Sequence, residues 1–151
     1  MPNVRGFEFP ADRWYLMEQD TWVRLGDDGL ATIGITSLGA YISGDFIEFI
    51  AKPSGTSIER DRSLGALEMS KVIRSARSPV SGKIVEVNAA VRARPALINA
   101  DPYGEGWLVR LMPVSWDADV ARLVRGDGIA PAVEAYMSTL VESFGEPKPA
   151  G

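Results

Sequence analysis

The chain contains neither histidine nor cysteine, which removes most of the side-chain chemistry that enzymes use near neutral pH. Without an imidazole or a thiolate there is no Ser-His-Asp or Cys-His nucleophile, no disulfide and no thiolate zinc site. No run of acidic residues has the D-x-D-x-D-G spacing of a calcium loop, so no metal site is predicted. We therefore do not expect the chain to catalyse a reaction by itself.

The remaining chemistry is concentrated in the stretch ALEMSKVIRSARSPVSG, residues 66–82. It places Lys71, one of only four lysines, between two runs typical of strands, and a Pro-Val-Ser-Gly turn signal follows. Glu68 precedes this lysine by three residues and Gly82 follows it by eleven. A single lysine in a turn is most often a solvated charge, so the rest of the sequence must decide whether Lys71 does more.

Length and composition indicate one soluble globular domain. The 151 residues are 46% hydrophobic and 24% charged, which is too apolar for a disordered chain. A net charge of −4 argues against a nucleic-acid partner. No apolar run approaches the roughly 20 residues of a membrane helix, and no signal pattern opens the chain. We expect a cytoplasmic protein with no membrane partner.

The elements that would position Lys71 are predicted to be short strands. Asp28-Gly29 is a hairpin turn signal, and residues 45–50 alternate between apolar and polar side chains. We expect one or two helical turns at residues 36–42, a loop at 52–57 and mostly turn at 95–106. The predicted strands are residues 22–25, 30–35, 45–50, 64–69, 72–77, 83–87 and 107–113.

The final quarter is predicted to be helical. Residues 116–124 form the first expected helix, and residues 126–128 interrupt it. Pro131 is suited to the first turn of a second helix, which Glu134 would stabilise through the helix dipole. That helix has an apolar face, expected to pack against the sheets: Val133, Met137, Leu140, Val141 and Phe144. We expect one domain over residues 1–145 and a disordered tail over residues 146–151.

Six motifs in order resemble those of the H protein of the glycine cleavage system and its lipoate-carrying relatives. The motifs are DTWVRL, ATIGIT, LGALEMSK, SPVSG, EVN and INADPYGEGWLVRL, and the resemblance covers about residues 14–116. It implies a mainly β barrel-sandwich hybrid with C-terminal helices. It also implies that Lys71 carries lipoic acid in amide linkage and that the lipoate-attaching enzyme recognises Glu68.

The resemblance implies a carrier of a covalent cofactor. A tethered arm has an effective concentration of about millimolar at each partner site, and the cofactor supplies the chemistry. A chain without cysteine suits this role, because no resident thiolate can attack the lipoyl disulfide. Biotin is the lesser alternative, because its lysine usually lies between two methionines, whereas Ser70 and Val72 flank Lys71 here.

The sequence departs from the family where a glycine cleavage H protein would hold a cationic aminomethyl group. Thr21, Leu38 and Ser75 occupy positions that are polar or ionisable in those proteins, and Asp20 matches a family histidine. Burying an ammonium group without partners costs several kcal/mol. In a strand, Ser75 and Arg77 share one face, so we expect Arg77 rather than Arg74 to meet an anion there. We predict an arm cleft formed by Thr21, Leu38, Ser75 and Arg77 that accepts neutral or anionic cargo.

A relative with this profile is the lipoate-binding protein of the sulfur-oxidising heterodisulfide reductase-like system. Residues 4–10 (VRGFEFP) and 116–137 resemble its N-terminal segment and C-terminal extension. This reading implies as partners the heterodisulfide reductase-like complex, a lipoate-attaching enzyme and dihydrolipoyl dehydrogenase. One alternative is an H protein that passes an aminomethyl group between glycine cleavage enzymes. Another is an unmodified binding module, which the retained Lys71 and Glu68 disfavour.

Overall fold

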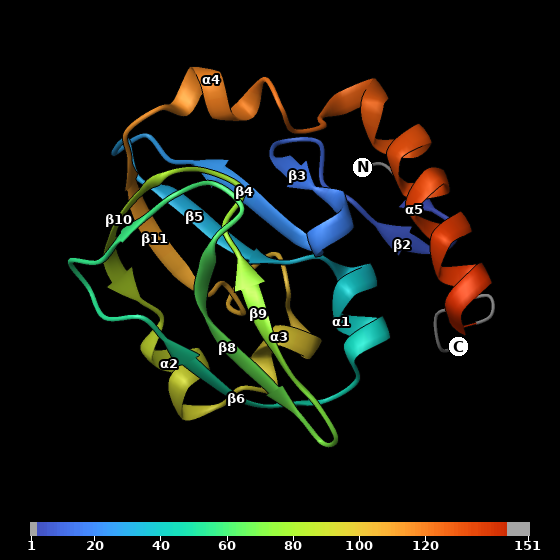
Figure 1. Cartoon of the computed structure of the whole chain (residues 1–151), viewed down its shortest axis with the longest axis horizontal. Coiled ribbons are helices and arrows are strands. Elements are labelled where there is room, and N and C mark those ends of the chain that lie inside the picture. Colours follow the sequence, from blue (N-terminus) through green and yellow to red (C-terminus); the bar gives the residue numbers. More distant parts are fainter. Residues whose placement is uncertain (1–2, 145–151) are drawn as a thin grey trace.

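A computed structural model describes residues 3–144 of the chain. Two sheets form the body of the molecule, and Figure 1 shows the helices around them. The larger sheet has the strand order β3-β4-β5-β11-β10-β7. Its strands are β3 (Trp14–Leu16), β4 (Thr21–Leu25), β5 (Ala31–Ile35), β7 (Ser57–Ile58), β10 (Gly82–Val87) and β11 (Val109–Pro113).

The smaller sheet carries the lysine hairpin. It has the antiparallel order β6-β8-β9, with β6 spanning Phe46–Ala51, β8 Ser63–Met69 and β9 Ile73–Arg77. A separate two-stranded hairpin, β1 (Asn3–Val4) and β2 (Phe7–Glu8), precedes both sheets. The helices are η1 (Met17–Gln19), α1 (Ser37–Ser43), α2 (Ala89–Ala93), α3 (Leu97–Ala100), α4 (Trp116–Val120), η2 (Gly126–Gly128) and α5 (Ile129–Phe144).

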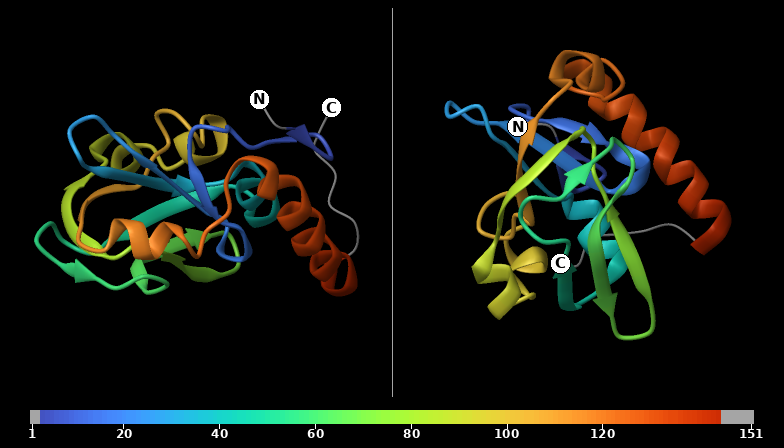
Figure 2. Two further views of the ribbon diagram at one scale, coloured as in Figure 1. Left: turned by 90° about the horizontal axis from the view of Figure 1, so that it is seen from above. Right: turned by 60° about the vertical axis from the view of Figure 1, so that its left-hand side comes forward.

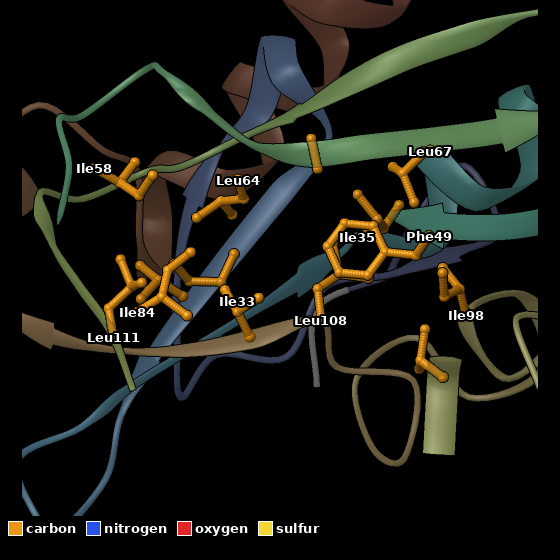
Figure 3. Packing of buried hydrophobic residues seen from close by; sticks show 14 of the residues in the cluster. Ile33, Ile35, Phe49, Ile58, Leu64, Leu67, Ile84, Ile98, Leu108 and Leu111 are labelled. Atoms are coloured by element: carbon orange, nitrogen blue, oxygen red, sulfur yellow. The ribbon is translucent and has the colours of Figure 1, made fainter. Parts of the chain in front are cut away.

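The two sheets share one hydrophobic core, which fixes the base of the lysine hairpin. Ile33, Ile84 and Leu111 from the larger sheet are fully buried in the same cluster as Leu64 and Leu67 from β8 (Figure 3). From Gly65 to Met69 alternate residues of β8 are buried, and a register shift between Ser63 and Gly65 brings Leu64 into the same core. The mainly β, lipoyl-domain-like fold expected from the sequence is confirmed.

A second core explains the position of the C-terminal helix. Val133 and Met137 of α5 are buried against a cluster that includes Phe9, Trp22 and Leu38. Figures 1 and 2 show α5 beside the N-terminal hairpin at one side of the molecule. The prediction that the apolar face of this helix packs against the sheets is confirmed in part: Val133 and Met137 share a cluster with Trp22 of the larger sheet, and the N-terminal segment and η1 cover the rest of it.

Several boundaries differ from the predicted ones for local reasons. Residues 95–106 contain α3, and α2 lies just before them, with its first turn capped by the Asn88 side chain. The helix expected over 116–124 ends at Val120, and α5 begins two residues before Pro131. Strand β7 lies at the end of the loop expected over 52–57. The proposed tail at 146–151 lies outside the described residues.

Candidate functional site

Lys71 lies at the turn of the β8–β9 hairpin. The Met69 N–H donates to the Val72 carbonyl at 2.9 Å, so Ser70 and Lys71 form a two-residue loop. The Lys71 side chain is exposed, and no hydrogen bond or ion pair to it is found among residues 3–144. Figure 1 shows this hairpin extending away from the helices. An acyl group on the Lys71 amine would therefore meet no steric obstacle at its attachment point.

Glu68 lies close to Lys71, on the outward face of the small sheet. Its Cα partners are Ile73 on β9 and Glu48 on β6, so two carboxylates stand directly opposite each other on neighbouring strands. Neither carboxylate has an ion-pair partner among the described residues. Like charges in this arrangement destabilise a sheet. Fold stability therefore does not explain why both carboxylates are present.

Large apolar side chains are exposed around this carboxylate pair. Ile73 is 67% exposed, Val72 57%, Ile50 55% and Ile47 51%. A β-bulge in β6 directs both Ile47 and Glu48 to the outside, which adds an apolar side chain to this face. Exposed apolar groups gathered beside charges are typical of surfaces that meet other proteins. The region around Lys71 is therefore suited to contact with partner proteins.

The four predicted cleft residues do not line one open cleft. Ser75 and Arg77 share a face of β9, as predicted, and line one pocket with a volume of about 810 Å³. Thr21 and Leu38 are fully buried, Leu38 among the side chains of the second core. The Thr21 hydroxyl has no hydrogen-bond partner among the described residues. Thr21 and Leu38 therefore offer a ligand no accessible polar group.

Arg74, which the sequence did not single out as a site residue, contacts Asp20 and the residue before it. Its Nη1 lies 3.1 Å from the Asp20 Oδ2, and its Nη2 donates to the Gln19 carbonyl at 3.3 Å. Arg77 is directed elsewhere and donates from Nη1 to the Asp61 carbonyl at 2.8 Å. Arg74 thus lies on the face of β9 opposite Ser75 and Arg77, and the expectation that Arg77 rather than Arg74 meets an anion beside Ser75 stays a prediction.

Asp20 is held in a buried position by the backbone and by helix α1. The residue is 2% exposed, and its φ of 63° places it in the left-handed region. Gly39 of α1 packs against it, since a Cβ at Gly39 would lie 2.4 Å from the Asp20 Cβ. Burial raises the pKa of the Asp20 carboxyl, and the Arg74 guanidinium opposes this shift. Burial and the nearby Asp20 raise the pKa of Tyr136 on α5.

We expect Arg74→Ala to lower the free energy of unfolding by about 2 kcal/mol at neutral pH. This is below the 3–5 kcal/mol of a fully buried pair, because the Arg74 side chain is 30% exposed. Loss of the guanidinium leaves a buried carboxylate without its cation and raises the folded-state pKa of Asp20 further. Because that pKa is above the unfolded value, the loss should shrink as the pH falls and Asp20 takes up a proton.

Urea unfolding at several pH values measures this effect, with Arg24→Ala as the control. Arg24 is 50% exposed, and the Asp12 carboxylate 4.0 Å away from it is exposed as well. That substitution should change stability by less than about 0.5 kcal/mol. A loss in Arg74→Ala that stays constant from neutral pH to pH 4 would contradict the assigned role of Asp20.

The fold and the hairpin lysine define a class of protein: a small β carrier domain that presents one lysine at an exposed turn. Comparison with known proteins gives the family. The sequence profile of the glycine cleavage H-protein family matches residues 14–136, and the chain belongs to that family. Members of the family carry lipoic acid on a lysine, act with partner enzymes, and are carriers rather than catalysts.

Individual relatives agree with this assignment. Glycine cleavage system H protein 2 of Aquifex aeolicus is 31% identical over 95% of this chain and 89% of its own. Probable glycine cleavage system H protein 3 of Sulfurisphaera tokodaii is 36% identical over 82% of this chain and 99% of its own. The crystal structure of a glycine cleavage system H protein from Mycobacterium marinum superposes with a TM-score of 0.71 at 30% identity, covering 87% of this chain and 98% of that one.

Within the described residues, 3–144, no group of three or more acidic side chains is arranged to hold a metal ion. No helix there is both long and apolar enough to cross a membrane.

Two features of the site could not be found by inspecting single motifs. Glu48 was visible in the sequence as a polar residue of a predicted strand, but only the strand register places it opposite Glu68. The Arg74–Asp20 pair joins residues 54 positions apart. The one signal in the sequence was Asp20, which precedes Trp22 and stands where the family has a histidine. A carboxylate that becomes buried at such a position needs a cation as its partner.

Proposed function

We propose that this protein is a lipoate carrier, modified on Lys71, that serves cytoplasmic sulfur oxidation together with a heterodisulfide reductase-like complex. The observation that carries the first part is the exposed, unpaired Lys71 on a two-residue hairpin loop with Glu68 nearby. A lipoate-attaching enzyme would load the arm, and dihydrolipoyl dehydrogenase would act on it. When bound, the lipoyl group supplies dithiol and disulfide chemistry.

The charge and burial of the residues predicted to line the arm cleft favour the second part of the proposal, the role in sulfur oxidation. A cationic aminomethyl group brought near Thr21 and Leu38 would find two buried residues and the guanidinium of Arg74. The Asp20 carboxylate is 2% exposed and already paired with that guanidinium. Ser75 and Arg77, by contrast, line an open pocket that an anionic cargo could approach. The region therefore suits an anion better than an ammonium.

Aminomethyl transfer in glycine cleavage is the second candidate function. The names of the relatives from Aquifex aeolicus, Sulfurisphaera tokodaii and Mycobacterium marinum favour it. Reconstituted aminomethyl transfer and sulfur uptake, measured side by side, separate the two functions.

Glu68→Ala is expected to slow lipoylation severalfold without unfolding the protein. The carboxylate lies on the outer face near Lys71, where a lipoate-attaching enzyme can reach it. Its removal also relieves the opposition to Glu48, so stability should stay within about 0.5 kcal/mol of wild type. Initial rates of lipoylation by a purified lipoate ligase, followed by intact mass, measure the effect.

Glu48→Ala is the matched control, because it removes the opposing carboxylate and leaves Glu68 in place. Loading of this variant should stay within twofold of wild type. Equal slowing of both variants would assign the effect to surface charge in general, and unchanged loading of Glu68→Ala would show that Glu68 is not recognised.

A further inference from the structure

A strongly basic pocket lies between the free edges of the two sheets. Four basic side chains line it, against the single carboxylate of Glu59. They come from four separate segments of the fold: Lys52, Arg62, Arg77 and Lys83. The whole chain carries a net charge of −4, so this local excess of positive charge is opposite to the balance of the molecule.

Carboxylates lie beside the pocket, among them Asp119, which accepts from the Ser81 N–H, but none forms an ion pair with the pocket cations in the described part of the chain. Among the described residues, Lys52, Arg62 and Lys83 form no ion pair, and Arg77 donates to the neutral Asp61 carbonyl. Like charges brought together repel one another, and the repulsion is removed when an anion binds between them. The arrangement therefore favours the binding of an anion in the pocket.

Neutral donors surround the same space. Five serines line the pocket, at positions 57, 63, 75, 81 and 115. Strand β7 ends one sheet and β9 ends the other, so each has an edge that pairs with no described strand. Sheet edges present backbone N–H groups that can bind anions, and the serine hydroxyls other than that of Ser63, which donates to the Gly65 carbonyl, add further donors. Cations, hydroxyls and strand edges together make a donor-rich concavity.

The lining also limits the class of ligand. None of the residues that form this pocket is aromatic, so it offers no stacking platform for a nucleobase. A single carboxylate is too few to hold a divalent cation. The remaining class is a multiply charged anion with several acceptor oxygens.

We propose that this pocket binds a small, multiply charged oxyanion, either a phosphate or a sulfur oxyanion. The inference goes beyond the proposed carrier function and does not depend on lipoylation. It does place one edge of the pocket close to the arm, because Ser75 follows Lys71 by four positions in the chain, a Cα distance of at most about 14 Å.

Isothermal titration calorimetry on the unlipoylated Lys71→Arg protein tests the proposal. Phosphate, sulfate, sulfite and thiosulfate serve as probes at constant ionic strength set with chloride. We expect saturable binding of at least one probe, one per chain. The double variant Lys52→Gln/Lys83→Gln should bind it at least tenfold more weakly, since both side chains are exposed and their replacement leaves the core intact.

Arg92→Gln/Arg94→Gln is the matched control, because it removes two exposed cations from the region of α2, outside the pocket. This variant should bind the probe within twofold of the parent protein. Tighter binding of phosphate than of the sulfur oxyanions would identify the ligand as a phosphate. Tighter binding of sulfite or thiosulfate than of phosphate would identify it as a sulfur oxyanion. Absence of saturable binding, or equal weakening in the control, would overturn the site and leave the carrier function unaffected.

Discussion

Lys71→Arg is expected to abolish lipoylation and to leave the fold unchanged. The side chain is exposed on a two-residue loop and has no hydrogen-bond or ion-pair partner among the described residues, so replacing it by another long cation removes no contact. A guanidinium, unlike a lysine amine, is not available as the nucleophile for acylation at neutral pH. Incubation with a lipoate ligase, ATP and lipoate, followed by intact mass, should show no increment, and the melting temperature should stay within a few degrees of wild type.

Lys83→Arg is the control for this experiment. Lys83 is also exposed and lies on strand β10, away from any hairpin turn that resembles the one at Lys71. This variant should be loaded at the wild-type rate. Loading of Lys71→Arg to the wild-type extent would show that another amine is the acceptor.

The fully lipoylated protein is expected to support glycine cleavage at least about a hundredfold more slowly than a glycine cleavage H protein. The aminomethyl group is a cation, the buried Thr21 and Leu38 offer it no carboxylate, and the Asp20 carboxylate is already paired with Arg74. A loss of about 3 kcal/mol in stabilisation corresponds to about a hundredfold in rate. The measurement reconstitutes glycine decarboxylation and methylene transfer with the three partner enzymes.

Dihydrolipoyl dehydrogenase provides an internal control in the same assay. It needs only an accessible arm, so it should reduce both carriers at similar rates. Sulfur uptake from a persulfide donor, followed by intact mass, should occur in the lipoylated protein and not in the Lys71→Arg variant. Aminomethyl transfer at a rate comparable to that of the H protein would contradict the sulfur proposal.

Most of the small-sheet geometry could be predicted from local sequence. Strand-like runs at residues 64–69 and 72–77 predict two strands, and the structure has β8 and β9 there with Lys71 between them. Period-2 alternation within the second run correctly separates Arg74 from Ser75 and Arg77 onto opposite faces of β9. These predictions succeed because side-chain direction in a strand depends on the backbone alone.

The environment of each face could not be predicted in the same way. Whether Arg74 or Arg77 meets the segment before Trp22 depends on how the two sheets pack, and it is the inward face of β9 that lies near Asp20. The convergence of Lys52, Arg62, Arg77 and Lys83 likewise depends on the neighbouring edges of two sheets. Such contacts between distant segments leave no periodic signal in the sequence.

Intact mass and peptide mapping of the protein purified from its native host test the central claim most directly. The account predicts one amide-linked lipoyl group per chain, on the peptide that contains Lys71. Lipoate on Lys52, Lys83 or Lys148, or a chain that carries no lipoyl group while other lipoyl proteins of the same cells are fully modified, would contradict it.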